Sequence, residues 1–157
     1  MAPSLLVDLS KIDLNRVLIP IEEIRQCNPH RYEMEMLSGC IHLDPEKGQI
    51  VAYKDVRADE FWVRGHIPGR PLMPGVLMIE AAAQMSSLYY KRVQKDPRFL
   101  GFGGVDGVKF RGQVVPGDRL LLLGQAIEIR SRRAVFDTQG VVGDRMVLEA
   151  RITGMPI

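Results

Sequence analysis

Residues 75–92 decide the fold, and they run Gly-Val-Leu-Met-Ile-Glu-Ala-Ala-Ala-Gln-Met-Ser-Ser-Leu-Tyr-Tyr-Lys-Arg. Between residues 76 and 90 the only charged side chain is Glu80. A helix that is apolar on all sides is buried rather than laid on a surface. Lys91 and Arg92 then place cations where they suit the negative end of the helix dipole. The sequence therefore predicts one buried helix over 75–92.

Segments typical of strands stand on both sides of this helix. On its N-terminal side we expect a short helix at 20–27, then a hairpin, then an irregular loop over 58–74. The predicted strands are 33–43, 49–57, 102–111, 119–130, 133–142 and 145–154. Hairpins before and after one buried helix predict an α+β domain, in which an antiparallel sheet wraps around one central buried helix.

Length and composition suit one soluble domain. The chain has 157 residues, of which 46% are hydrophobic and 25% charged. We expect an N-terminal extension over 1–19 and a single domain over 20–157. Leu5, Leu9 and Ile12 lie at helical spacing, so 4–17 is predicted to be an amphipathic segment that packs on its own protein.

Charge and hydropathy argue against two classes of partner. A net charge of +2 does not supply the dense basic face of a nucleic-acid-binding protein. No uninterrupted apolar run approaches membrane length, so no membrane partner is expected.

Neither a cofactor nor a metal is expected. Cys27 and Cys40 make no disulfide framework or metal knuckle, and as free thiols they favour a reducing cytoplasm. His30 is interpreted as structural and His42 as part of a strand surface. The chain carries no glycine motif of a nucleotide-binding protein in the required strand–helix context.

The stretch before and within the buried helix carries the chemistry. His66 lies in the proline-stiffened loop 58–74, and an imidazole titrates near neutral pH, as a general base must. Gly75 opens the helix, where free amides stabilise a developing oxyanion. Glu80 lies in apolar surroundings that favour its protonated, acidic form, and Gln84 one turn later is placed to hold its carboxyl group. Base, acid and carbonyl donor together suit a β-elimination.

These residues carry a resemblance to a known family. Gly-His-Ile-Pro-Gly-Arg-Pro-Leu-Met-Pro-Gly-Val-Leu-Met-Ile-Glu-Ala-Ala-Ala-Gln, at 65–84, closely resembles the 3-hydroxyacyl-acyl-carrier-protein dehydratases of type II fatty-acid synthesis, the FabZ/FabA type. The spacing from His66 to Glu80, 80 − 66 = 14, is also that family's. Further matches are Asn-Pro-His-Arg-Tyr at 28–32, Val-Asp-Gly-Val-Lys-Phe-Arg at 105–111 and Val-Val-Pro-Gly-Asp at 114–118.

The resemblance implies a hotdog fold and a homodimer or a trimer of such dimers, with each site shared between two subunits. Carried over, His66 takes the C2 proton, Glu80 protonates the leaving 3-hydroxyl, and the Gly75 amide binds the thioester carbonyl. The implied partner is an acyl carrier protein bearing a 3-hydroxyacyl thioester. Because position 80 is glutamate rather than aspartate, the chain resembles the dehydratase-only branch of the family more than the dehydratase–isomerase branch.

The chain also departs from the family pattern. Glu33 stands where the family usually has proline, Ile67 where phenylalanine is common, and 34–39 differs from the usual apolar strand. These changes leave the acid and base in place, and they leave the acyl chain length open.

Two other functions are compatible with a hotdog domain. An acyl thioesterase would use a carboxylate and a helix amide to direct water at the thioester, but it would not need His66. A non-catalytic acyl-binding subunit would tolerate the altered segment 33–39, but loss of catalysis usually removes the acid or the base, and both are present.

Overall fold

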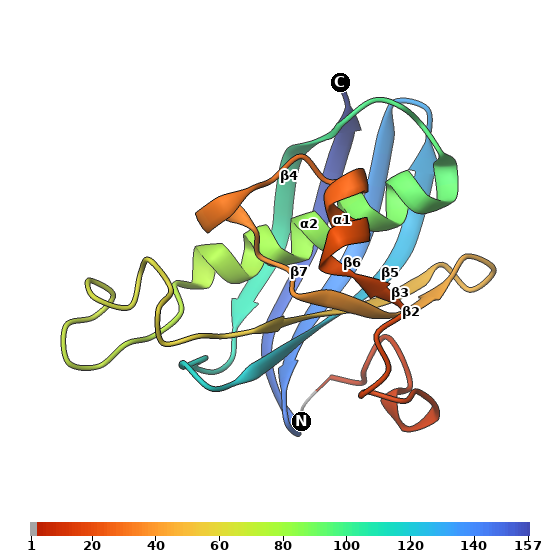
Figure 1. Cartoon of the computed structure of the whole chain (residues 1–157). Helices are drawn as coiled ribbons and strands as arrows, with labels where there is room; N and C mark the ends of the chain where they lie inside the picture. Colours follow the sequence, from red (N-terminus) through yellow and green to blue (C-terminus); the bar gives the residue numbers. More distant parts are fainter. Residues whose placement is uncertain (1–2) are drawn as a thin grey trace.

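A computed structural model describes residues 3–157, and its core is one antiparallel sheet that curves around a long helix (Figure 1). In the described residues the sheet has seven strands in the order β1-β2-β3-β5-β6-β7-β4. They are β1 Ile19–Pro20, β2 Gly39–Asp44, β3 Gln49–Asp55, β4 Leu100–Phe110, β5 Arg119–Arg130, β6 Arg133–Val142 and β7 Arg145–Pro156. The four predicted strands after the helix are confirmed, as is the hotdog arrangement of sheet and helix.

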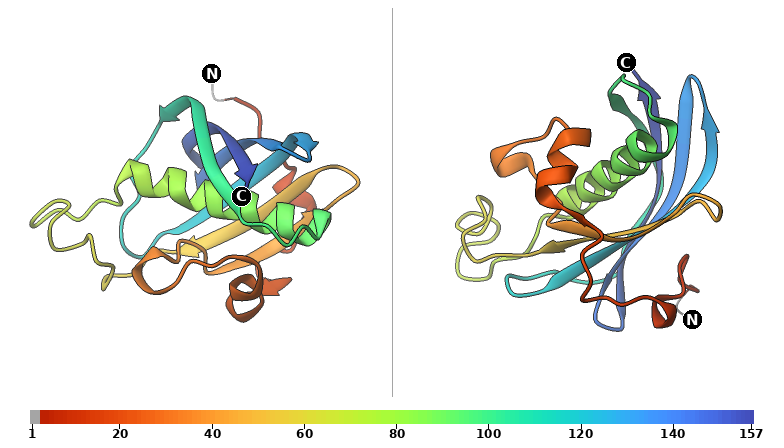
Figure 2. Two further views of the ribbon diagram at one scale, coloured as in Figure 1. Left: turned by 90° about the horizontal axis from the view of Figure 1, so that it is seen from above. Right: turned by 45° about the vertical axis from the view of Figure 1, so that its right-hand side comes forward.

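The central helix α2 spans Gly75–Gln94 and lies in the hollow of the sheet (Figure 2). Ala81, Met85 and Leu88 on this helix are fully buried. The predicted buried helix is therefore confirmed. Lys95 ends it in a left-handed conformation, with φ of 56°.

A short helix, α1 Ile21–Cys27, packs beside α2, as predicted for 20–27. The strand predicted over 33–43 is wrong in its first half, because β2 begins only at Gly39. Residues Tyr32–Met34 form a 3-10 turn instead. The backbone of this stretch bonds to a side chain of α2 rather than to a neighbouring strand.

Both faces of the sheet are apolar where β3 and β5 cross its middle. Leu122 faces α2 in the main core, whereas Leu123 belongs to a second apolar cluster on the opposite face. Residues 6–14 cover that opposite face, so the predicted packing of 4–17 on its own protein is correct. The helical spacing of Leu5, Leu9 and Ile12 does not produce an α-helix, because the regular element within 4–17 is the 3-10 turn Leu9–Lys11. The side chains reach the sheet from irregular backbone held by polar contacts.

The two thiols are free, and Cys40 is buried. Burial raises the pKa of the Cys40 thiol to about 11, which leaves it unreactive near neutral pH. Among the described residues, no helix is both long and apolar enough to cross a membrane.

We predict that Leu122→Ala and Leu123→Ala each lower the free energy of unfolding by ~2–5 kcal/mol, because both side chains are fully buried, on opposite faces. Ile127→Ala, on the same strand but 50% exposed, should change it by less than ~0.5 kcal/mol. Urea denaturation measures all three. A small effect for Leu123→Ala alone would mean that the N-terminal segment does not seal the outer face.

Candidate active site

Glu80 lies in the second turn of α2 with its side chain 23% exposed. Its Oε1 accepts a hydrogen bond of 2.8 Å from Nε2 of Gln84, one turn further along the helix. The predicted contact between these two side chains is therefore present. It holds the carboxyl group in one orientation at the edge of the apolar core.

Gln84 itself is held by the segment that departs from the family pattern. Its Oε1 accepts a hydrogen bond of 2.9 Å from the Met36 amide, and its Nε2 donates one of 2.7 Å to the Met34 carbonyl. Gln84 is only 3% exposed, so these bonds are shielded from water. The Gln84 side chain therefore links Glu80 to the backbone of the turn after α1. The sequence did not predict this link.

His30 is a second neighbour of Glu80 that sequence reasoning did not assign to the site. Its Nε2 lies 3.5 Å from Glu80 Oε1, beyond a good hydrogen bond but within ion-pair range. Burial lowers the pKa of His30 below its ordinary value of 6.5, against the opposing effect of the Glu80 carboxylate. His30 is therefore mainly neutral at pH 7. The signal that pointed to it was its place in the matched motif at 28–32.

His66 lies in the irregular loop between β3 and α2, in an exposed run over 64–70. Its Nδ1 is 2.7 Å from the Leu72 carbonyl oxygen, which can only accept, so Nδ1 carries the proton and donates it. In the neutral ring Nε2 is then unprotonated and available as a base. Backbone bonds from the His66 amide to Trp62 and from the Leu72 amide to His66 fix this part of the loop.

Gly75 begins α2, and the first amides of a helix have no partner within it. A β-carbon at this position would lie 2.7 Å from Cε1 of Phe110, so a larger residue would require that half-exposed ring to move. The Gly75 amide is thus at the positive end of a long helix, where it suits an oxyanion.

The structure brings three of these residues together, and His66 and Gly75 lie outside their cavity. Glu80, Gln84 and His30 line one cavity of about 30 Å³, together with apolar side chains that include Phe99. His66 does not line this cavity. The loop that carries it, drawn in yellow-green, projects beyond the sheet in two views (Figures 1 and 2). Within a single chain, Glu80 and His66 therefore do not share a pocket.

Larger hollows lie elsewhere on the described residues. One of about 370 Å³ lies over β6 and β7, and one of about 550 Å³ lies between the turn Tyr32–Met34 and the end of β3. Neither is lined by Glu80 or His66. In residues 3–157 no three His, Cys, Asp or Glu side chains form a group able to hold a metal ion.

Comparisons with known proteins identify the family of this hotdog domain, which has a carboxyl group set into its central helix. The family model of the FabA-like domain matches residues 28–151, so the chain belongs to the FabA-like family. It is 36% identical over 136 residues to the 3-hydroxyacyl-[acyl-carrier-protein] dehydratase FabZ of Listeria monocytogenes, covering 86% of this chain and 94% of that protein. It is 38% identical over 138 residues to FabZ of Ralstonia nicotianae, covering 84% and 82%.

Solved structures show the same fold at lower sequence identity. The dehydratase heterocomplex ApeI:P of Xenorhabdus doucetiae superposes with a TM-score of 0.73 at 15% identity, covering 90% of this chain and 93% of that one. The PaaI protein of Escherichia coli gives a TM-score of 0.62 at 18% identity, covering 86% and 91%. These likenesses concern the fold alone.

We predict that Gln84→Ala destabilises the protein by on the order of 2 kcal/mol, because it leaves the Met36 amide and the Met34 carbonyl without partners in a buried place. The exposed Gln94→Ala, at the end of the same helix, is the matched control and should shift stability by less than ~0.5 kcal/mol. Equal denaturation midpoints for the two variants would contradict the bridging role of Gln84.

Proposed function

We propose that this protein is a 3-hydroxyacyl-[acyl-carrier-protein] dehydratase, a hydro-lyase of fatty-acid or related lipid or polyketide biosynthesis, with His66 as base and Glu80 as acid. Family membership and the FabZ relatives support this proposal. One observation of the site gives the proposal its strongest support. Nδ1 of His66 is hydrogen-bonded to the Leu72 carbonyl, which leaves Nε2 free to take a proton.

The reaction removes water across C2 and C3 of the acyl chain. Nε2 of His66 takes the C2 proton, and the electrons of that bond form the double bond between C2 and C3. The C3–O bond breaks as Glu80 gives its proton to the leaving hydroxyl, which departs as water. The Gly75 amide donates to the thioester oxygen, where negative charge develops. Gln84 holds the acid in orientation.

Two subunits are needed to complete this site in our proposal. His66 lies in a projecting loop, outside the cavity beside Glu80, so we place His66 of one subunit at Glu80 of another. We propose a homodimer, alone or as part of a trimer of dimers.

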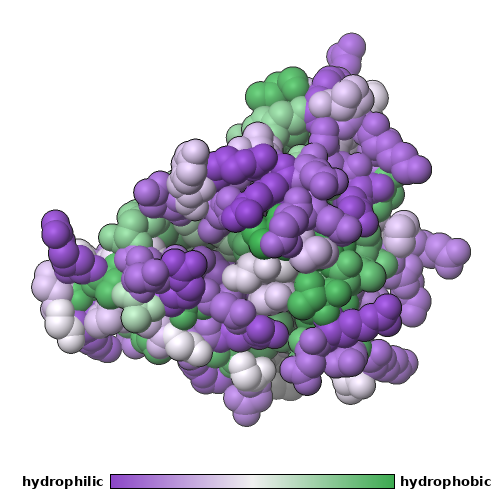
Figure 3. Space-filling model, viewed as in Figure 1, coloured by the Kyte–Doolittle hydropathy of each residue, from purple (hydrophilic) through white to green (hydrophobic). Residues whose placement is uncertain are grey.

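The surface around the loop supports such a dimer. The exposed large apolar side chains there include Phe61, Ile67, Val76 and Phe110, which are 49–68% exposed, and Figure 3 shows apolar surface on the projecting loop. Large apolar patches usually mark interfaces. The edge strand β4 also offers a free row of backbone groups to a second copy.

The substrate is proposed to arrive on an acyl carrier protein, the carrier in the names of the FabZ relatives. The free thiols Cys27 and Cys40 suit the reducing cytoplasm that forms part of the proposal. A thioesterase would give no role to the oriented imidazole of His66. A non-catalytic subunit would give none to the Glu80–Gln84 pair.

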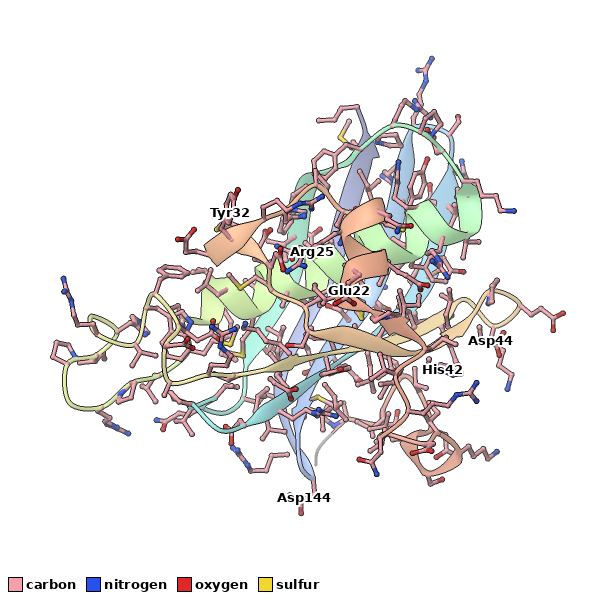
Figure 4. All side chains as sticks on the ribbon, in the orientation of Figure 1. Glu22, Arg25, Tyr32, His42, Asp44 and Asp144 are labelled. Carbon is pink, nitrogen blue, oxygen red and sulfur yellow. The ribbon has the colours of Figure 1, made fainter. Side chains whose placement is uncertain are left out.

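We predict that His66→Ala and Glu80→Gln each lower kcat by at least ~10²-fold, because each removes a group that acts mainly in the transition state. KM should stay within a few-fold, and Gln84→Ala should cost clearly less kcat than either. The assay follows hydration of a crotonyl thioester by loss of enoyl absorbance. His42→Ala is the matched control, since His42 lies on β2 at the end of the molecule away from the projecting loop (Figure 4).

Folding of each variant is confirmed first by circular dichroism. A folded His66→Ala protein with near wild-type kcat would refute the elimination mechanism. Hydrolysis of acyl thioesters without hydration of enoyl thioesters would favour the thioesterase instead. Loss of activity in His42→Ala equal to that in His66→Ala would remove the special role of His66.

A further inference from the structure

The carboxyl group of Glu80 is contacted by two side chains on the same oxygen. Oε1 accepts a hydrogen bond of 2.8 Å from Nε2 of Gln84, and Nε2 of His30 lies 3.5 Å from it. Because both contacts are to Oε1, that oxygen is the fixed end of the carboxyl group, and Oε2 is the end left for a transferred proton. The proposed mechanism uses Gln84 but not His30.

The backbone on both sides of His30 is held against α2. Nδ2 of Asn28 donates a hydrogen bond of 3.0 Å to the Gln84 carbonyl, and Asn28 is only 3% exposed. The Arg31 guanidinium donates to the carbonyls of Asn28 at 2.9 Å and of His30 at 2.7 Å. These bonds tie the loop 28–31 to the turn of the helix that carries Gln84, so the His30 ring meets Glu80 in a fixed position.

The surroundings of the His30 ring decide which nitrogen carries its hydrogen. Nδ1 is buried and, within residues 3–157, has no hydrogen-bond partner. A buried N–H group without an acceptor is costly, so in the neutral ring the hydrogen belongs on Nε2, which faces Oε1 of Glu80. The ring also packs against Phe99, with the two ring centroids 5.9 Å apart. Burial lowers the pKa of His30, which favours this neutral donor over a cation.

We propose that His30 is a positioning residue for Glu80, and that its Nε2–H group and the Gln84 amide together hold Oε1 so that the proton of the acid lies on Oε2. This inference rests on the proposed function. During the elimination the proton passes from Oε2 to the C3 hydroxyl, the C3–O bond breaks and water leaves, while His30 keeps its own proton. Negative charge then develops on the carboxyl group, and both donors on Oε1 stabilise it. Hydrogen bonds to a charged acceptor are shorter than neutral ones, so we expect the 3.5 Å contact to shorten at that stage.

The test uses two leaving groups to separate the acid from the rest of the site. A 3-hydroxybutyryl thioester needs a proton on its departing oxygen, whereas a 3-chlorobutyryl thioester loses chloride, which leaves without one. The base takes the C2 proton from both substrates. Both reactions form the same enoyl thioester, so its absorbance follows each of them after correction for the uncatalysed rate.

His30→Phe keeps an aromatic ring against Phe99 and removes the donor to Glu80. We expect it to lower kcat for the 3-hydroxy substrate about tenfold, because a hydrogen bond to a charged group is lost. KM should stay within a few-fold, and kcat for the 3-chloro substrate should change by less than ~2-fold. His30→Gln keeps a neutral amide donor and should recover most of the lost kcat. His42→Phe is the matched control on β2 and should leave both rates unchanged.

Three results in folded full-length protein would overturn the proposal. They are equal losses of kcat for the two substrates in His30→Phe, which would mean a structural role, wild-type kcat for the 3-hydroxy substrate in that variant, and no recovery in His30→Gln. If His30→Phe does not fold, His30→Ala takes its place with the same expected pattern, and equal losses for both substrates overturn the proposal there too.

Two parallel variants distinguish failure of this inference from failure of the proposed function. We expect Glu80→Gln to lose the 3-hydroxy reaction and keep the 3-chloro reaction, and His66→Ala to lose both. If these results hold while His30→Phe behaves like the wild type, only the inference about His30 fails. If Glu80→Gln keeps the 3-hydroxy reaction, the proposed function itself is wrong, and the role of His30 falls with it.

Discussion

The burial of α2 is the constraint on which the rest of the structure depends. The helix has no polar side, so the sheet must curve around it, and buried polar side chains such as Gln84 and Ser86 are held by hydrogen bonds. Glu80 enters at the edge of the core, and its carboxyl group is held by Gln84 and faced by His30. The same packing that makes the fold thus holds the carboxyl group of Glu80 in one orientation.

Gln84 connects this helix to the backbone of Met34 and Met36, in the segment that departs from the family pattern. Its amide bonds to the backbone of Met34 and Met36, not to their side chains. Side chains in this turn can therefore differ from the family pattern without disturbing the acid, provided that the backbone keeps its path. This explains how a chain that lacks the usual apolar strand after 28–32 retains the orientation of Glu80.

Most of the fold could be predicted from the sequence, because helix α2 and the later strands follow from hydrophobic periodicity and turn residues. Residues 33–38 could not, since the backbone of Met34 and Met36 bonds to Gln84, and no local pattern reports a bond to a side chain 48 residues away. The backbone of the N-terminal segment was not predictable for a related reason. Leu5, Leu9 and Ile12 have helical spacing, but the sheet and Gln139 hold the chain in an irregular path. In the site, the contact of Glu80 with Gln84 was predictable from i, i+4 spacing, whereas the approach of His30 depends on the packing of α1 against α2.

The central claim is that one catalytic unit takes His66 from one subunit and Glu80 from another. The direct test is to make heterodimers of differently tagged His66→Ala and Glu80→Gln subunits, purify them by both tags, and measure crotonyl-thioester hydration. Each parent homodimer lacks the base or the acid in both sites, whereas the heterodimer has one site with both groups and one with neither. The account predicts about half of the wild-type kcat per dimer, since one of two sites is intact. A purified heterodimer no more active than its parents would contradict it.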